Sequence, residues 1–154
     1  MKTLTHKISG VALFGVCWAA DLPPELCVGV IFGATAPDFL EFPTWNNEVR
    51  TSWIDHRTVT HSPLLWFLLM LLPFFISVKF AFFSLFLAGF AASAFMHVAM
   101  DSTTPMGVPL FINFWKRQRL SAAVAITLTM IVLIILKKLV ENYQAQNYAL
   151  IKFF

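Results

Sequence analysis

The sequence is poor in charged residues, which make up only 12% of its 154 residues. Soluble domains carry about 25% charged residues on average, so this composition excludes an ordinary soluble domain. The hydrophobic share of 58%, the 17 phenylalanines and the mean hydropathy of +0.74 indicate an integral membrane protein instead. Three or more lipid-embedded segments leave no length for a separate soluble module, so we expect one domain over residues 1–154.

Cysteine is scarce as well, since the chain has only Cys17 and Cys27. Both fall in apolar runs, which predicts buried, unreactive thiols and disfavours a disulfide or a metal role. The first 20 residues resemble a signal peptide, because Lys2 and Lys7 precede an apolar stretch. We expect this segment to be retained; its loss would also remove His6.

The apolar runs predict an all-α fold, a multi-pass membrane bundle of about five helices. The first two runs are shorter than the roughly 20 residues that cross a bilayer upright, so they form a hairpin that either spans with a tilt or enters and returns. Pro63 suits the first turn of the third helix, and Pro73 kinks or ends it. The runs are Ile8–Ala20, Leu26–Ala36, Pro63–Val78, Phe80–Met100 and Leu120–Leu136, the last followed by an amphipathic tail.

Histidines and carboxylates gather where these helices would meet one face of the membrane. In an up-and-down arrangement four separate connections deliver such residues to the same depth, whereas the far loops offer only Asp21, Glu25 and Lys79. Ionisable residues at membrane segments are costly and mark functional sites. The residues on the predicted site face are His6 before the first helix, Asp38 after the second, His56 and His61 before the third, and His97 with Asp101 ending the fourth.

The pair His97 and Asp101 lies at i, i+4, so both side chains share one helix face. The spacing fits two metal ligands, and it also fits a plain His–Asp hydrogen bond. Gly29 and Gly33 form a GxxxG pair that allows close helix packing without naming a partner. A serine-type nucleophile beside His61 is disfavoured, because adjacent residues rarely point at each other, and Thr60 or Ser62 more naturally caps the third helix.

At these positions the sequence resembles the YdjM-like, LexA-associated family of small inner-membrane proteins, described as metal-dependent hydrolases. The resemblance covers about residues 5–110, which we expect to hold the metal-site core, with residues 120–154 as C-terminal helix and tail. It implies a metal-dependent hydrolase in the bacterial inner membrane and names no substrate. The motifs that carry it are Thr5-His6, Pro37-Asp38, His56-Arg57-x-x-Thr60-His61-Ser62 and His97-x-x-x-Asp101-x-x-Thr104-x-x-Gly107.

One position departs from the family pattern, which usually has a second aspartate two residues after the first. Leu40 stands there, so either Glu41 takes that place or one ligand is absent. A looser likeness points to zinc-dependent phospholipases C and related nucleases, whose ligand order His, Asp, His, HxxxD is similar. That likeness implies phosphodiester hydrolysis with at most two of three metals, because no histidine follows His97.

Neutral imidazoles and carboxylates suit one or two divalent ions, with zinc the expected metal. We assign Asp38, His61 and His97 to one ion, with Asp101 bridging to a second ion held by His6 and, as a further candidate, His56. An ion with one open position lowers the pKa of bound water towards about 7. We assign catalysis to His56 and Arg57, whose planar guanidinium can clamp two phosphate oxygens.

The predicted function is therefore a membrane-embedded hydrolase of a phosphoester or phospholipid-like substrate. A non-catalytic protein with a structural or transport metal site is the alternative. We expect membrane lipids as partners and no nucleic acid. The cluster Lys116, Arg117 and Arg119 fits either an anionic headgroup or a topology signal.

Charge placement predicts the orientation of the chain. Seven of the eleven basic residues fall on the site face, and cytoplasmic loops collect Lys and Arg, so we expect the site to face the cytoplasm. Lys137 and Lys138 flank the other end of the last span and favour the opposite orientation. The seven residues are Lys2, Lys7, Arg50, Arg57, Lys116, Arg117 and Arg119.

Overall fold

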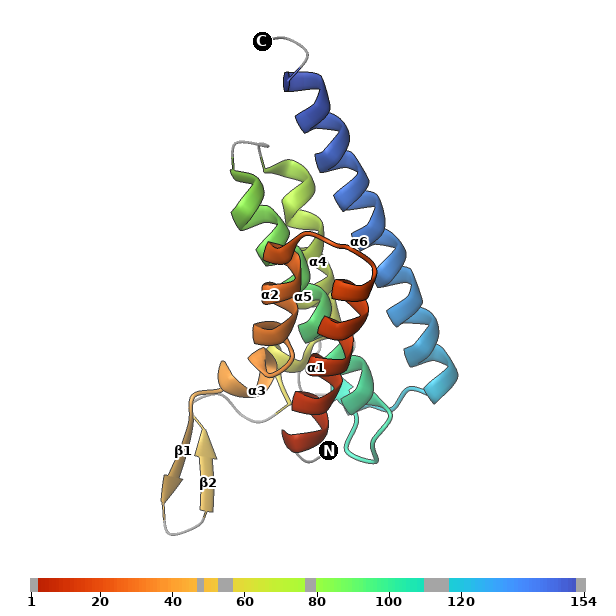
Figure 1. Cartoon of the computed structure of the whole chain (residues 1–154). Helices are drawn as coiled ribbons and strands as arrows, with labels where there is room; N and C mark the ends of the chain where they lie inside the picture. Colours follow the sequence, from red (N-terminus) through yellow and green to blue (C-terminus); the bar gives the residue numbers. More distant parts are fainter. Residues whose placement is uncertain (1–2, 47–48, 53–56, 77–79, 110–116, 152–154) are drawn as a thin grey trace.

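The computed structural model describes residues 3–46, 49–52, 57–76, 80–109 and 117–151 (Figure 1). Within these residues the chain forms six α-helices, two 3₁₀ turns and two short hairpins, so the all-α prediction is confirmed. The helices are α1 (Thr3–Ala19), α2 (Pro24–Gly33), α3 (Ala36–Phe39), α4 (Pro63–Leu71), α5 (Ala81–Ser102) and α6 (Ala122–Ile151). The 3₁₀ turns are η1 (Val59–His61) and η2 (Leu72–Phe75).

Proline sets several of the helix boundaries. Pro24 occupies the first turn of α2 and Pro63 the first turn of α4, where a missing backbone N–H costs no hydrogen bond. Pro73 falls where α4 gives way to the 3₁₀ turn η2, as expected for a residue that cannot continue the α-helical hydrogen bonds. The boundaries predicted at Pro63 and Pro73 are confirmed.

Both ends of the bundle differ from the prediction. Helix α1 begins at Thr3, so His6 lies within its first two turns rather than before it. Helix α6 continues through the predicted tail to Ile151, because the residues after Lys138 remain good helix formers without glycine or proline. The four-residue helix α3 was not predicted, and it lies in the connection that carries Asp38.

Helix α5 is the centre of the fold, with α2, α4 and α6 packed against it and α1 packed on α2. The two glycines of the GxxxG pair face α5: a Cβ atom on Gly29 would overlap the carbonyl oxygen of Phe86, and one on Gly33 would overlap that of Phe90. On α5, Gly89 lies equally close to the carbonyl oxygen of Leu26. The pair therefore has a definite partner, which the sequence alone did not name.

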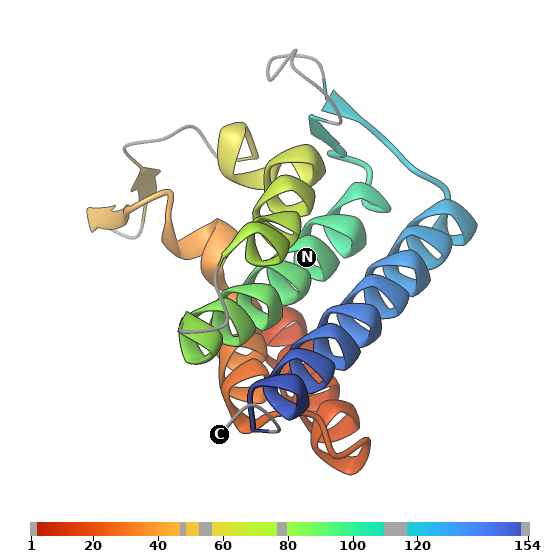
Figure 2. The same ribbon diagram turned by 90° about the horizontal axis from the view of Figure 1, so that it is seen from above.

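Two of the described helices, α5 and the Ala122–Ala145 part of α6, are long and apolar enough to cross a membrane by length and composition. Helices α2 and α4 with η2 are apolar but shorter. Figure 2 shows α6 along one side of the molecule, and its spanning window is only 28% buried against 61% for α5. A five-helix spanning bundle thus stays a prediction, whereas two candidate spans are observed.

The two hairpins lie in the polar connections. Strands β1 (Pro43–Asn46) and β2 (Val49–Ser52) pair antiparallel, with Pro43 opposite Ser52. Strands β3 (Val108–Pro109) and β4 (Arg117–Gln118) form the second pair. The β1–β2 hairpin projects from the end of the bundle where the N-terminus lies, and the C-terminus lies at the opposite end (Figure 1).

Candidate metal centre

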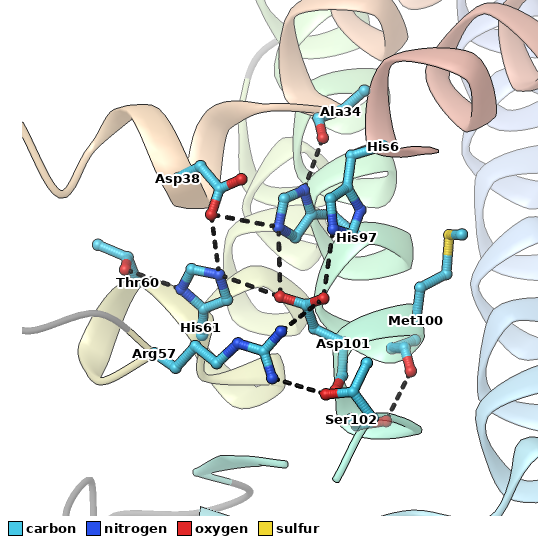
Figure 3. Close-up of polar contacts among 12 residues, drawn as sticks. His6, Ala34, Asp38, Arg57, Thr60, His61, His97, Met100, Asp101 and Ser102 are labelled. Carbon is cyan, nitrogen blue, oxygen red and sulfur yellow. Dashed lines mark hydrogen bonds and ion pairs between the residues drawn. The ribbon is translucent and has the colours of Figure 1, made fainter. Parts of the chain in front are cut away.

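Five side chains predicted as metal ligands converge at the N-terminal end of the bundle. They come from separate elements: His6 from α1, Asp38 from α3, His61 from η1, and both His97 and Asp101 from α5 (Figure 3). Two overlapping groups, each with its ligand atoms within 4.8 Å of one another, could hold an ion. These are His6, His97 and Asp101, and Asp38, His61 and His97.

Two histidine nitrogens each lie near the same two carboxylate oxygens. The His61 Nε2 atom lies 3.4 Å from Asp38 Oδ1 and 3.5 Å from Asp101 Oδ2. The His97 Nε2 atom lies 3.8 Å and 3.7 Å from the same two oxygens. Tetrahedral zinc with bonds of about 2.0–2.1 Å places its ligand atoms roughly 3.3–3.4 Å apart. These four nitrogen–oxygen distances are close to that spacing.

The histidine rings are oriented for ligation. Nδ1 of His97 lies 2.7 Å from the carbonyl oxygen of Ala34, so this nitrogen carries the proton and donates it to the carbonyl. The opposite nitrogen, Nε2, is buried, makes no hydrogen bond among the described residues, and faces the two carboxylates. A backbone acceptor on the far nitrogen fixes the tautomer of metal-binding histidines in this way.

Glu41 holds the other ring. Its Oε1 atom lies 3.0 Å from Nδ1 of His61, accepts the backbone N–H of Arg57 at 3.0 Å, and lies 3.4 Å from the Thr60 hydroxyl. Glu41 is completely buried and sits on the opposite side of the imidazole from Asp38 and Asp101. In this structure it therefore orients His61 and does not occupy the position of the missing aspartate.

Thr60 and His61 contact each other despite being neighbours in sequence. The Thr60 hydroxyl lies 3.2 Å from Nδ1 of His61, at the 3₁₀ turn η1. Ser62 is the N-cap residue of α4, and no side chain makes a capping hydrogen bond there. The predicted side-chain cap by Thr60 or Ser62 is wrong.

Charge in the cluster favours a cation. Burial raises the pKa of the Asp38 carboxyl, but the His61 hydrogen bond and the nearby His97 and His6 rings bring it below its usual value. Burial lowers the pKa of His61, but its bonds to Asp101, Asp38 and Glu41 outweigh this and raise it to about 10. Without a metal, His61 therefore carries a proton, and three carboxylates, one guanidinium and this imidazolium leave a formal charge of −1. A divalent ion bound by His61 would have to displace that proton.

His6 completes the far side of the cluster. Its Nε2 atom lies 3.2 Å from Asp101 Oδ1, and its ring stacks on His97 with centroids 3.6 Å apart. Its Nδ1 atom is buried without a hydrogen-bond partner among the described residues. A second ion was predicted at His6 and Asp101. There it would compete for Asp101 Oδ1 with the guanidinium of Arg57, and this second ion stays a prediction.

Arg57 is that guanidinium. Nη2 lies 3.0 Å from Asp101 Oδ1, while Nη1 donates to the Thr104 hydroxyl at 2.7 Å and to the Gly107 carbonyl at 3.3 Å. The side chain is buried, and the backbone adopts φ 60°, a conformation that non-glycine residues hold only where surrounding contacts fix it. Its clamp role stays a prediction, since no substrate group tests it.

Sequence reasoning overlooked the roles of Thr104, Gly107 and the Ala34 carbonyl. Thr104 and Gly107 stood in the quoted HxxxDxxTxxG pattern, so their spacing from Asp101 was an available signal. The Ala34 carbonyl carried no signal in the sequence. His56 and Lys116, in contrast, lie outside the described residues, and only the backbone of Arg117 is described.

Asp38 is the most exposed of the five clustered side chains. It is 18% exposed, whereas those of His6, His61, His97 and Asp101 are at most 2% exposed. The α3 side is therefore the side on which the cluster meets the surface. An ion that keeps one position for substrate or water needs access of this kind.

A family model described as YdjM inner membrane protein matches residues 1–154, the whole chain. No curated protein and no solved structure matches the sequence or the fold.

Proposed function

The chain belongs to the YdjM inner membrane protein family, and from that premise we propose that its buried His/Asp cluster binds a divalent metal, with zinc the best fit, and hydrolyses a phosphoester at the membrane face. The observation that carries the proposal is that Nε2 of His61 and Nε2 of His97 each lie 3.4–3.8 Å from both Asp38 Oδ1 and Asp101 Oδ2. Polar groups this deeply buried are costly unless a partner satisfies them.

Each residue of the cluster has a separate role in this proposal. Bound zinc would supply a Lewis acid and a water of lowered pKa. Glu41 and the Ala34 carbonyl fix the two imidazoles, Asp38 lies where the cluster meets the surface, and Arg57 both holds Asp101 and supplies positive charge for an anionic substrate. His56 stays a candidate catalytic residue on sequence grounds.

The alternative is a structural or transport metal site without catalysis. Four potential ligand atoms already lie close together, and His61, His97 and Asp101 are almost fully buried. A closed, four-ligand site is typical of structural zinc. The 18% exposure of Asp38 favours the open site.

Metal content and turnover test the proposal directly. Purified protein should contain about one tightly held divalent ion per chain by elemental analysis, since four ligands of this kind bind zinc firmly. The same sample should hydrolyse a phosphodiester or lipid phosphate in a screen, lose activity to a chelator and regain it with zinc. Bound metal without turnover on any phosphoester would favour the non-catalytic alternative, and the absence of metal would contradict both.

We further propose that the site faces the cytoplasm, from the excess of basic residues at that end. A cysteine at Asn46, in the projecting β1–β2 hairpin, should resist an impermeant thiol reagent in intact cells and react after permeabilisation. A cysteine at Asn147, in the part of α6 beyond the Ala122–Ala145 span, is the matched control and should react in intact cells. The reverse labelling pattern would place the site on the periplasmic side.

A further inference from the structure

An apolar groove of about 270 Å³ runs between α5 and α6 on the side away from the His/Asp cluster. Figure 3 shows Met100 on the side of α5 away from His61, next to α6. Methionine is flexible and polarisable, so a wall containing three methionines adapts to ligands of irregular shape. The residues that matter here are Met96, Met100 and Thr103 on α5 or its C-cap and Ala122, Ile126 and Met130 on α6.

The position of the groove limits what can occupy it. Its walls are the two candidate membrane spans, so its apolar surface lies at the depth of lipid tails. The volume is slightly below the roughly 300–1,000 Å³ of pockets for drug-sized ligands, which suits part of one extended chain. An acyl chain fits these conditions.

A cation is fixed at the end of this groove. The exposed Arg119 donates from Nε to the carbonyl oxygen of Thr103 at 3.2 Å, and the next residue, Leu120, donates its N–H to Ser102 at 2.9 Å. Thr103 itself lines the groove. The guanidinium is thereby attached where a lipid headgroup would lie, and arginine pairs with phosphate in a bidentate geometry.

We propose that the α5–α6 groove binds one acyl chain of an anionic lipid whose phosphate meets Arg119. The groove ends at Thr103, two residues after Asp101, so the headgroup would lie at the same end of α5 as the metal cluster. Because the groove lies on the side of α5 away from the cluster, the proposal concerns lipid binding and does not rest on the proposed hydrolase function.

Photocrosslinking in phosphatidylcholine nanodiscs tests the groove. The probe is phosphatidic acid with a photoreactive diazirine in one acyl chain, used with chelator-treated protein so that metal plays no part. Cross-linked peptides should come from the groove segments of α5 and α6. Excess unlabelled phosphatidic acid should compete, whereas excess phosphatidylcholine and inorganic phosphate should not.

Matched variants separate the groove from general lipid contact. Ala122→Phe fills the groove from an exposed helix position and should lower the cross-linked yield about tenfold, or about 1.4 kcal/mol. Ala123→Phe adds the same ring at the exposed neighbouring position, which does not line the groove, and should leave the yield unchanged. Arg119→Ala should lower the yield for phosphatidic acid and abolish its advantage over phosphatidylcholine.

Several results would overturn the proposal. Equal labelling of Ala122→Phe and Ala123→Phe would mean ordinary contact with bulk lipid. Effective competition by phosphatidylcholine, or an unchanged yield in Arg119→Ala, would refute the anionic headgroup. Cross-links to a second copy of the chain at the same residues would make the groove a dimer contact. If protein that has not been treated with chelator is cross-linked by the probe but contains no metal, the groove would be supported and the proposed hydrolase contradicted.

Discussion

Replacing His97 with alanine should leave the protein without its metal. Nε2 of His97 belongs to both groups of potential ligands, so its removal damages either ion that the cluster could hold. Loss of even an outer partner of a ligand costs about 10- to 100-fold in metal affinity, and loss of a ligand should cost more than about 100-fold. His61→Ala should have a similar effect, because that ring contacts both Asp38 and Asp101.

Elemental analysis after dialysis against a weak chelator measures this effect. Met96→Ala is the matched control, since it shortens the neighbouring side chain on the same helix and lines the groove rather than the cluster. Zinc should raise the unfolding temperature of the native protein and of Met96→Ala but not of His97→Ala, because only a bound ligand stabilises the fold. Full metal content in both histidine variants, with intact membrane insertion, would show that the ion lies elsewhere.

Replacing Arg57 with alanine should abolish turnover while the metal stays bound. The proposed metal ligands do not include any Arg57 atom, so their geometry can survive the change. Removing one preorganised donor to a developing charge costs about 10²- to 10³-fold in turnover, and we expect a loss of that size on a phosphoester. Arg57→Lys should recover little, because an ammonium lacks the fork that meets two oxygens and also contacts Thr104 and Gly107.

A purely structural role of Arg57 would give a different result. The guanidinium lies 3.0 Å from Asp101 Oδ1, and breaking a buried ion pair is typically destabilising by about 3–5 kcal/mol. Loss of metal from Arg57→Ala in a protein that still folds would mean that Arg57 holds Asp101 in place and is not a clamp. Lys138→Ala removes one exposed cation from α6 and should change neither metal content nor turnover.

Local sequence rules explain the parts of the fold that were predicted. Pro24, Pro63 and Pro73 act through a missing N–H and a fixed φ, which any sequence reveals directly. The shared face of His97 and Asp101 follows from helix periodicity alone. The convergence of His6, Asp38 and His61 on this pair was predicted by counting which helix ends lie at the same face of the membrane.

Contacts between distant residues explain the parts that were not predicted. The bond between Glu41 and His61 needs the turn at Phe42, where φ is 49°, and the 3₁₀ turn η1, neither of which has a periodic signature. The partners of Arg57 lie 47 and 50 residues away in sequence. The partner of the Gly29 and Gly33 pair depends on which helix packs against α2, and small-residue spacing does not specify that.

The spread of the cluster along the chain dictates when it can form during synthesis. Its members lie at positions 6, 38, 61, 97 and 101, so the nascent protein lacks a complete site until α5 has left the ribosome and packed against α2. Before that moment the chain holds only His6, Asp38 and His61 of the five. Under the proposed metal-binding function, loading of the ion would therefore follow the synthesis of α5, and a chain that ends before α5 should bind no metal at this site.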